Sequence, residues 1–320
     1  MRVLVTGATG FVGNVLCSLL AQRGYRVRAA LRTERSIPAC IQEKVVVGDI
    51  GSITRWAAAL DDVDAVIHLA ARTHILDDMS AAASLYMETN SHGTRHLADA
   101  AAQAKVERFL FLSSIKVNGE DSPQRAYRSS DEPHPEDAYG TSKWIAEQML
   151  AEVAAKTAMQ MAIVRSPLVY GPGVRANFLR LMQWVESQWP IPLAAVRNRR
   201  SLVSVWNLCD LLVNLLSNPG GVGGTWMVSD GEDLSTPEFI RRVGRAMNRR
   251  VRLVSVPVDL LRLCGSVTGR QADVKRLCGS LFVDIAETRD KLGWSPPVPV
   301  DQALAHTVAW YLSEGKGHGA

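Results

Sequence analysis

The tyrosine and lysine at positions 139 and 143 are the side chains of this sequence best suited to proton transfer. Residues four apart on a helix share one face, so the Lys143 ammonium would lie beside the phenol. A nearby positive charge favours the phenolate, so we expect the pKa of Tyr139 to fall toward neutrality and this side chain to act as general acid and base. The alternative is a solvated helix face that carries no chemistry.

Two hydroxyl side chains, Ser113 and Ser114, directly follow an apolar run at 109–112. This run predicts a buried strand, so the two serines are expected at its carboxyl end. Open α/β sheets bind ligands outside the carboxyl ends of their strands. Ser114 precedes Tyr139 in the chain. We therefore expect this serine to orient the atom that Tyr139 protonates.

Three glycines with the spacing G-x-x-G-x-x-G, Gly7, Gly10 and Gly13, lie between an apolar run at 3–5 and helically spaced apolar residues from Val12. Strand, glycine-rich turn and helix form the context of a dinucleotide-binding fingerprint. Gly7 would permit the tight turn, Gly10 would let a pyrophosphate approach, and Gly13 would let helix and strand pack closely. The amides at the helix start would face the phosphates. The alternative is a glycine-rich turn without a ligand.

Short apolar segments alternate with amphipathic ones over the first 165 residues, which predicts βαβ units and a parallel sheet. The fold class expected is α/β, a Rossmann-like doubly wound parallel sheet with a smaller C-terminal substrate-binding lobe. The expected strands are 3–5, 27–31, 44–47, 65–69, 109–112 and 161–165, and the expected helices are 12–23, 53–60, 84–102 and 139–155.

The second half of the chain loses this alternation. We expect residues 1–170 to form the dinucleotide-binding domain and residues 171–320 to form mainly the substrate-binding lobe, with segments near 201–230 returning to the first domain. In that region 202–205 and 225–228 are predicted as strands of the main sheet. A last helix is predicted at 300–312.

Composition limits the class of protein. The 320 residues are 47% hydrophobic and 21% charged with a net charge of +4, which indicates a globular chain and gives little support for a nucleic-acid partner. Five cysteines without C-x-x-C spacing predict no disulfide framework and no metal site, and they favour the reducing cytoplasm. No signal peptide and no 18-residue apolar window are found, so no membrane insertion is expected.

Motifs along almost the whole chain resemble those of a known family. They are TGATGFVG at 6–13, GD at 48–49, HLAA at 68–71, N-x-x-G-T at 90–94, SSIKVNGE at 113–120, YGTSK at 139–143, RSPLVYGPG at 165–173 and LGW at 292–294. Together they resemble the extended short-chain dehydrogenases/reductases, in particular NAD(P)-dependent nucleotide-sugar epimerases and dehydratases. Within this family they resemble bacterial UDP-sugar 4-epimerases and 4-ketoreductases of surface-polysaccharide synthesis.

The resemblance implies roles for individual residues. Tyr139 would be the general acid and base, Ser114 would bond to the same sugar oxygen, and Lys143 would bind the nicotinamide ribose. The further cofactor-binding positions implied are Gly7, Gly10, Phe11, Val12, Gly13, Asp49, Ile50, Leu69, Ala70, Ala71 and Pro167. The substrate-binding positions implied, besides Ser114, are His74, Lys116, Asn177, Arg200 and Arg276. The substrate implied is a UDP-sugar, and a homodimer is expected through the helices that begin near 84 and 139.

Two positions depart from the family pattern. Leu31 stands where NAD-preferring relatives carry an acidic residue, and the Arg32 that follows can pair with a 2′-phosphate, so NADP(H) is favoured over NAD(H). Trp206 stands where a helix-capping Asp or Asn is expected, and Asn207 is predicted to cap instead.

Two enzyme activities share the same first chemistry. A 4-ketoreductase, slightly favoured by the missing acidic residue at position 31, would reduce a 4-keto sugar and release its cofactor, whereas a 4-epimerase would keep the cofactor bound. A 4,6-dehydratase is disfavoured because Ile115 and Lys116 follow Ser114 where an acidic pair is needed. A cofactor-sensing regulator is disfavoured because Ser114, Tyr139 and Lys143 are all present.

Overall fold

A seven-stranded parallel sheet forms the centre of the computed structural model, which describes residues 1–73, 79–122 and 124–314. The strand order is β3-β2-β1-β4-β5-β6-β9. The strands are β1 (Arg2–Thr6), β2 (Arg26–Leu31), β3 (Glu43–Val46), β4 (Ala65–His68), β5 (Arg108–Ser114), β6 (Gln160–Ser166) and β9 (Gly224–Met227). This order confirms the doubly wound α/β fold, in which the chain turns back at β1 and crosses to β4.

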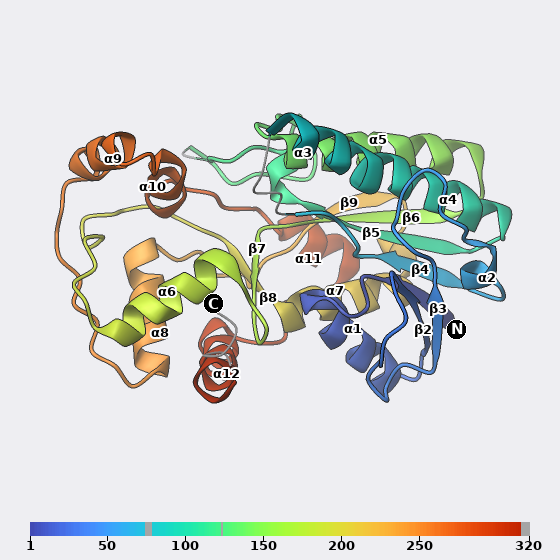
Figure 1. Ribbon diagram of the computed structural model, residues 1–320, viewed down its shortest axis with the longest axis horizontal. Coiled ribbons are helices and arrows are strands. Elements are labelled where there is room, and N and C mark those ends of the chain that lie inside the picture. Colours follow the sequence, from blue (N-terminus) through green and yellow to red (C-terminus); the bar gives the residue numbers. More distant parts are fainter. Residues whose placement is uncertain (74–78, 123, 315–320) are drawn as a thin grey trace.

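Helices cover both faces of this sheet (Figure 1). The face packed on α1 (Phe11–Gln22) and α7 (Val205–Ser217) buries Val3 and Val5, and Leu4 points to the other face. That other face is covered by α2 (Ala57–Leu60), α4 (Gly93–Gln103) and α5 (Ala138–Lys156). Strands buried on both faces explain why the sequence shows continuous apolar runs instead of alternation.

The long helix expected at 84–102 is interrupted. It consists of α3 (Met79–Tyr86), a π-helical turn (Met87–His92) and then α4. The turn holds Ser91 against α5, where its hydroxyl donates to the carbonyl of Ser142 at 2.8 Å. The helix expected at 53–60 is also shorter, since α2 begins at Ala57.

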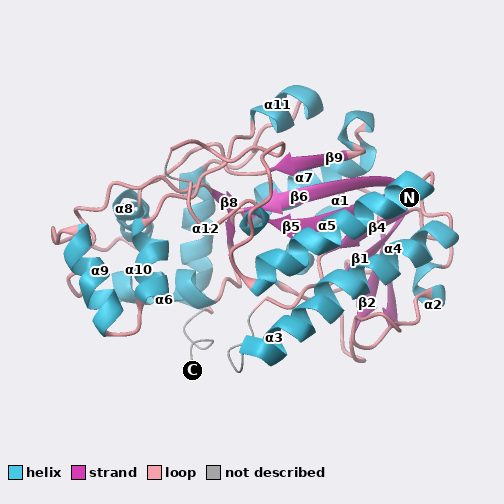
Figure 2. Ribbon diagram, turned by 90° about the horizontal axis from the view of Figure 1, so that it is seen from above, coloured by secondary structure: helices cyan, strands magenta, loops and turns pink. Residues whose placement is uncertain are grey.

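The second half builds a separate apolar core beside the sheet. Its buried side chains come mainly from helices that stand away from the sheet in Figures 1 and 2. The elements of this half are β7 (Leu168–Tyr170), α6 (Ala176–Ser187), β8 (Leu202–Ser204), α8 (Thr236–Ala246), α9 (Val258–Val267), α10 (Gln271–Cys278), α11 (Ala286–Leu292) and α12 (Val300–Ser313). The helix predicted at 300–312 is confirmed.

The two strands expected to return to the main sheet behave differently. The segment predicted at 225–228 joins the sheet as β9, beside β6. The segment predicted at 202–205 does not, because its residues Leu202–Ser204 pair with β7 in a two-stranded parallel sheet. The free edge of β6 is paired with β9, and β8 is paired with β7, the strand that directly follows β6 in the chain.

The cap of α7 also differs from the prediction. Ser204 caps the helix by accepting a hydrogen bond from the amide of Asn207 at 3.3 Å. The Asn207 side chain instead donates to Asp230 at 2.7 Å and to the Val298 carbonyl at 2.9 Å. Trp206 packs edge-on against His306, with ring centroids 5.4 Å apart.

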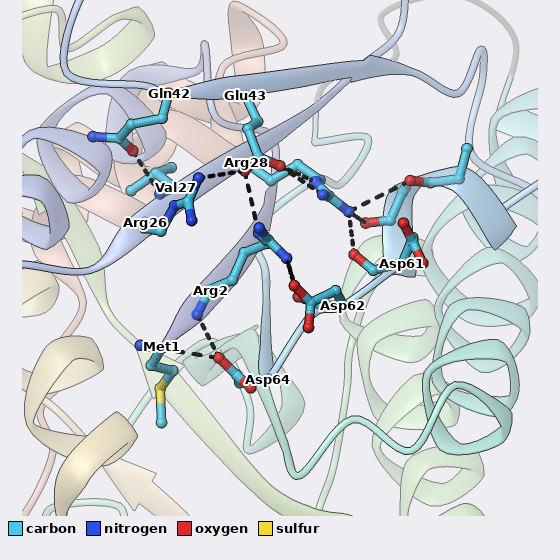
Figure 3. A network of polar contacts seen from close by, with 12 residues as sticks. Met1, Arg2, Arg26, Val27, Arg28, Gln42, Glu43, Asp61, Asp62 and Asp64 are labelled. Atoms are coloured by element: carbon cyan, nitrogen blue, oxygen red, sulfur yellow. Dashed lines mark hydrogen bonds and ion pairs between the residues drawn. The ribbon is translucent and has the colours of Figure 1, made fainter.

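Charged side chains stabilise the amino end of β1 and β2, away from the strand ends that build the candidate site (Figure 3). The guanidinium groups of Arg2 and Arg28 both bind Glu43 of β3. Arg28 also donates to the carbonyls of Ala59 at 3.2 Å and Asp61 at 2.6 Å, at the end of α2. A cation at a helix C-terminus donates hydrogen bonds to the free carbonyls and interacts favourably with the negative end of the helix dipole.

Candidate active site

The glycine turn between β1 and α1 packs as the fingerprint predicts. Gly7 has φ +70°, and a Cβ atom there would lie 2.9 Å from the amide nitrogen of Ala70. A Cβ atom at Gly13 would lie 2.1 Å from the carbonyl oxygen of Gly7. Only glycine fits at both positions, so the turn is tight and the loop after β4 crosses directly against it.

The start of α1 can hold an anion. Gly10 is its N-cap residue in an extended conformation, no side chain caps the helix, and no acidic residue lies in the first turn. The amides of Phe11, Val12 and Gly13 are therefore left without helical acceptors at the positive end of the dipole. These features fit a dinucleotide pyrophosphate.

The loop after β4 is held by a buried histidine. Ala70 donates its amide hydrogen to Oγ1 of Thr6 at 3.2 Å, and this oxygen lies 2.6 Å from Nδ1 of His68. The other ring nitrogen of His68 lies 2.9 Å from Oγ1 of Thr94. Burial lowers the pKa of His68 to about 3, so the ring is neutral and acts as a fixed link. The predicted cofactor residues Leu69 and Ala70 are thereby positioned beside the glycine turn, and Ala71 follows them in the chain.

Arg32 and Asp49 face each other beyond the ends of β2 and β3. Nη1 of Arg32 lies 3.9 Å from Oδ1 of Asp49, and both side chains are about three-quarters exposed, at 74% and 76%. Ile50 lies next to Gly93, where a Cβ atom would meet its side chain at 2.8 Å. Pro167 follows the last residue of β6.

Tyr139 and Ser114 meet at the start of α5. Asp137 caps this helix by accepting from the amide of Gly140 at 2.6 Å, which fixes Tyr139 in its first turn. Burial raises the pKa of Tyr139 to about 12, the charge of Asp137 raises it further, and a side-chain hydrogen bond with Ser114 lowers it. The expected fall of this pKa toward neutrality is therefore wrong for the protein alone, because burial outweighs the favourable contacts.

Lys143 is itself shifted by burial. It is 2% exposed, and its Nζ lies 4.0 Å above the ring of Phe111 in the middle of β5. Burial lowers the pKa of Lys143 to about 7, while the charge of Glu147 raises it. At neutral pH the lysine is thus only partly charged, which limits how far it can favour the phenolate.

A buried ion pair lies beneath this lysine, and the sequence analysis missed it. Nη2 of Arg165 lies 2.6 Å from Oε2 of Glu147, and the side chains are 4% and 3% exposed. Glu147 also accepts from the hydroxyl of Ser113 at 2.5 Å, and Arg165 donates to Asn118 at 3.0 Å. The signal available in the sequence was the position of Glu147, one helical turn after Lys143.

Asn90 is a second residue that the sequence analysis left without a role. Its side chain accepts from the amide of Arg72 at 2.8 Å and donates to the hydroxyl of Ser142 at 3.0 Å. It thereby ties the loop after β4 to the helix that carries Tyr139 and Lys143. Its place in the π-helical turn explains why a simple helical period did not reveal it.

The residues expected to bind substrate are spread over several elements. Nζ of Lys116 lies 2.6 Å from Glu120 and also pairs with Asp137. Burial lowers the pKa of Lys116, but these two carboxylates outweigh it, so the net pKa is raised. Asn177 is exposed on α6. His74 lies outside the described residues.

Two of the predicted arginines lie together. Nη1 of Arg200 donates to the carbonyls of Arg276 at 2.8 Å and Gly279 at 3.1 Å. Burial lowers the pKa of Arg200, the charge of Asp121 raises it, and the like charge of Arg276 lowers it. Arg200 thus binds the main chain of the segment that carries Arg276, whose own guanidinium lies 3.9 Å from the carboxylate of Asp273.

These features together define a dinucleotide-binding protein with the serine, tyrosine and lysine of short-chain dehydrogenases/reductases. The model of the NAD dependent epimerase/dehydratase family matches residues 3–228. The chain belongs to this family of NAD-dependent enzymes, and the resemblance drawn from its motifs is confirmed.

Two curated relatives are similar over nearly their whole length. The chain is 39% identical over 314 residues to the UDP-glucose 4-epimerase of Vibrio cholerae, covering 97% of this chain and 95% of the relative. It is 26% identical to the N-acetyl-alpha-D-glucosaminyl-diphospho-ditrans,octacis-undecaprenol 4-epimerase of Escherichia coli O157:H7, covering 98% and 96%.

Solved structures show the same fold. MoeE5 in complex with UDP-glucuronic acid and NAD has a TM-score of 0.79 at 23% identity, covering 98% of this chain and 99% of that one. The UDP-glucuronic acid 4-epimerase of Bacillus cereus in complex with NAD has a TM-score of 0.77 at 22% identity, covering 97% and 98%.

Proposed function

We propose that the protein is a UDP-sugar 4-epimerase that keeps NAD bound through each turnover. The observation that carries the proposal is the 39% identity to a UDP-glucose 4-epimerase over 97% of the chain. The hydrogen-bonded pair of Ser114 and Tyr139 supports it, since an epimerase needs an acid and base at one sugar oxygen.

The chain offers places for the cofactor. The amides after Gly10 would bind the pyrophosphate, Asp49 and Ile50 would contact the adenine, and Lys143 would bind the nicotinamide ribose. Leu69, Ala70 and Ala71 would lie along the same ribose, and Pro167 would close the nicotinamide end. Bound NAD supplies reversible hydride transfer at C4 of the sugar.

The side chains of the site then handle one proton. With NAD bound, Tyr139 would act as the phenolate, which the positive charges of the nicotinamide ring and of protonated Lys143 favour against the effect of burial. Its Oη would take the proton of the C4 hydroxyl as that carbon is oxidised, while Ser114 holds the same oxygen by a hydrogen bond. The 4-keto sugar turns over, and Tyr139 returns the proton to the oxygen at inverted C4. Substrate and product are isomers, so no external oxidant or reductant is consumed.

The diphosphate of the substrate is assigned to the arginine pair. Arg200 and Arg276 would bind it as two adjacent cations, with Asn177 as a further hydrogen-bond donor. Lys116, which bridges Glu120 and Asp137, would lie beside the sugar. His74 is assigned to the same substrate.

A 4-ketoreductase is the second candidate, and Arg32 favours it. The acidic residue that would bind a ribose 2′-hydroxyl is replaced by Leu31, and an arginine follows. Such an enzyme would use NADP(H) and release it in each turnover. The NAD dependence of the family supports the epimerase instead.

The cofactor carried by the purified protein separates the two activities. The protein is denatured and its supernatant is analysed by mass spectrometry, and UDP-glucose is then incubated with fresh protein. The proposal expects close to one NAD per chain and formation of UDP-galactose without added cofactor. An empty protein that oxidises NADPH with a 4-keto sugar would overturn the epimerase assignment.

Tyr139→Phe provides the control for the chemistry. The variant keeps the ring that packs against Tyr86 at 5.9 Å between centroids, so NAD binding should be unchanged. Loss of the acid and base should slow epimerisation by about 10²–10⁴-fold. Turnover at the native rate would show that another group moves the proton.

Three other expectations stay predictions. They are the division into a dinucleotide-binding domain at 1–170 and a substrate lobe at 171–320, the homodimer through the helices near 84 and 139, and a role in the cytoplasm in surface-polysaccharide synthesis.

A further inference from the structure

Lys116 lies between the strand end that carries Ser114 and the helix that carries Tyr139. It belongs to the 3₁₀ turn Ile115–Val117, which directly follows β5. A Cβ atom at Gly140 would lie 2.7 Å from the carbonyl oxygen of Lys116, so this turn packs directly against the first turn of α5. Both the amide and the ammonium of Lys116 are therefore close to the groups that handle the proton.

The amide of Lys116 orients the hydroxyl of Ser114. It donates to Oγ of Ser114 at 3.3 Å and occupies one of the two acceptor positions of this oxygen. The hydroxyl hydrogen is then directed away from the turn. Burial raises the pKa of Tyr139, and the side-chain hydrogen bond with Ser114 lowers it, as donation to a phenolate does.

The ammonium of Lys116 pairs with the carboxylate that caps α5. Oδ1 of Asp137 accepts from the amide of Gly140 at 2.6 Å, and its Oδ2 pairs with Nζ of Lys116. The same Nζ lies 2.6 Å from Oε1 of Glu120. One half-buried cation thus holds two carboxylates, and one of these begins the helix of the acid and base.

The charge of Asp137 opposes formation of the phenolate. After burial, it is the next largest cause that raises the pKa of Tyr139. Burial raises the pKa of Asp137 itself, but the hydrogen bonds from Lys116 and from the amide of Gly140 outweigh it, so the net pKa is lowered and the carboxylate is ionised at neutral pH. Without the ammonium, this carboxylate and that of Glu120 would repel electrons at Tyr139 unscreened.

Other charged and titratable groups around Tyr139 come from several elements. Tyr86 of α3 packs edge-on against it, with ring centroids 5.9 Å apart, and Lys143 lies one helical turn further along α5. Near Lys143, Glu147 of α5 and Arg165 of β6 pair at 2.6 Å. A substitution in the 3₁₀ turn leaves all of these groups in place, so its effect on the pH profile reports the contact with the helix cap.

We propose that Lys116 is a positioning residue of the candidate active site, whose amide orients the Ser114 hydroxyl and whose ammonium screens the Asp137 carboxylate so that Tyr139 can form the phenolate. The inference rests on the acid and base role proposed for Tyr139. It assigns Lys116 an action through Asp137 that a contact with substrate alone does not include.

The pH profile of kcat/KM tests the proposal, measured with UDP-glucose on the NAD-loaded protein. Lys116→Met removes the charge, whereas Lys116→Arg keeps it. The acid limb of the profile should move to higher pH by roughly 0.5–1 unit in Lys116→Met and stay near its native position in Lys116→Arg. On that limb the shift corresponds to about three- to tenfold slower turnover at a given pH.

Asp137→Asn provides a rescue. Asparagine caps helices as well as aspartate, so the variant removes the charge and keeps an acceptor for the Gly140 amide. Alone, it should move the acid limb to lower pH. Combined with Lys116→Met, it should return the limb close to its native position, because Glu120 then supplies the same net charge that the three native side chains carry together.

Lys291→Met is the matched control. Lys291 pairs with Glu287 at 2.7 Å across the same spacing of four residues, but on α11. Its loss should leave the acid limb in place. Melting temperatures and circular dichroism check that each variant is folded, and Asp137→Asn tests the same charge if Lys116→Met does not fold.

Ultraviolet difference titration separates this proposal from the epimerase assignment. The phenolate absorbance of each protein is compared with that of the same protein carrying Tyr139→Phe, with and without NAD, so no turnover is needed. The midpoint of Tyr139 should lie above the native value in Lys116→Met and below it in Asp137→Asn. This order would support the role of Lys116 even in a protein that does not convert UDP-glucose.

Three results would overturn the proposal. In the first, Lys116→Met raises KM while the acid limb and the phenolate midpoint stay at their native positions, which would make Lys116 a substrate contact only. In the second, the double variant is displaced as far as Lys116→Met, so the effect does not pass through Asp137. In the third, Asp137→Asn leaves the limb and the midpoint unmoved.

Discussion

Replacing Glu147 by glutamine would leave the guanidinium of Arg165 buried without its counter-charge. The pair is joined at 2.6 Å with side chains 4% and 3% exposed, and the neutral Asn118 at 3.0 Å cannot replace the lost charge. Removing one partner of a buried ion pair costs about 3–5 kcal/mol of unfolding free energy. At about 2–4 °C per kcal/mol, the melting temperature should fall by roughly 6–20 °C.

The same change should also reach the candidate active site. The charge of Glu147 raises the pKa of Lys143, so neutralising it lowers this pKa further below its value of about 7. A smaller fraction of Lys143 is then protonated at neutral pH, and turnover should fall beyond what unfolding explains. Turnover is therefore measured at a temperature where the variant is fully folded.

Glu152→Gln is the matched control on the same helix. Glu152 pairs with Arg95 at 2.8 Å, but its side chain is 59% exposed. An exposed pair contributes about 1 kcal/mol or less, so the melting temperature should change by a few degrees at most.

The double variant Glu147→Gln with Arg165→Met completes the cycle. Removing both charges should recover most of the lost stability, because no buried charge is left unpaired. Turnover should stay low, because Lys143 still lacks its neighbouring carboxylate. The reasoning fails if Glu147→Gln costs no more than Glu152→Gln, or if the losses of the two single variants simply add in the double variant.

Three other changes have defined outcomes. Gly13→Ala places a Cβ atom 2.1 Å from the Gly7 carbonyl oxygen, so calorimetry should show a lower melting temperature and at least about tenfold weaker NAD binding. Asn14→Ala, at the exposed neighbouring position, is the control and should leave the melting temperature and the NAD affinity nearly unchanged. The pKa of Lys143 is lowered in the folded protein to about 7 from 10.5, so between these two values the unfolded chain holds the proton and the free energy of unfolding should rise with pH. Lys143→Met removes this proton, so its gain in unfolding free energy over the native protein should be largest below pH 7. Urea titrations should show that about 2 kcal/mol of this gain is gone by pH 9. Arg32→Asp should leave NAD binding measurable by calorimetry and weaken any NADP binding, and unchanged NADP affinity would remove Arg32 from cofactor selection.

Much of the fold was predictable because its signals are local. The segments of β1, β2, β4 and β5 each contain consecutive apolar residues, which an exposed segment would not have. Strands of this type belong to parallel sheets that are covered on both faces. The glycine turn was equally predictable, because the positive φ at Gly7 and the close packing at Gly13 exclude residues with a side chain.

Pairing partners were less predictable. The run at 202–205 has the composition of a strand, but composition does not say which edge is free to pair. Its true partner is β7, because β9 takes the edge of β6. The cap at Ser204 was missed for a similar reason, since Asn207 is drawn instead to Asp230, 23 residues away in the chain.

Residue types and spacing predict that Tyr139 and Lys143 share one helix face, and the order of the elements together with the family motifs predicts that Ser114 joins them. The protonation of that site depends on contacts between distant segments. Burial raises the pKa of Tyr139 to about 12 and lowers that of Lys143 to about 7, against the expectation from their spacing. Desolvation is set by everything packed around a group, including the ion pair of Glu147 and Arg165, and it becomes visible only once the chain is folded.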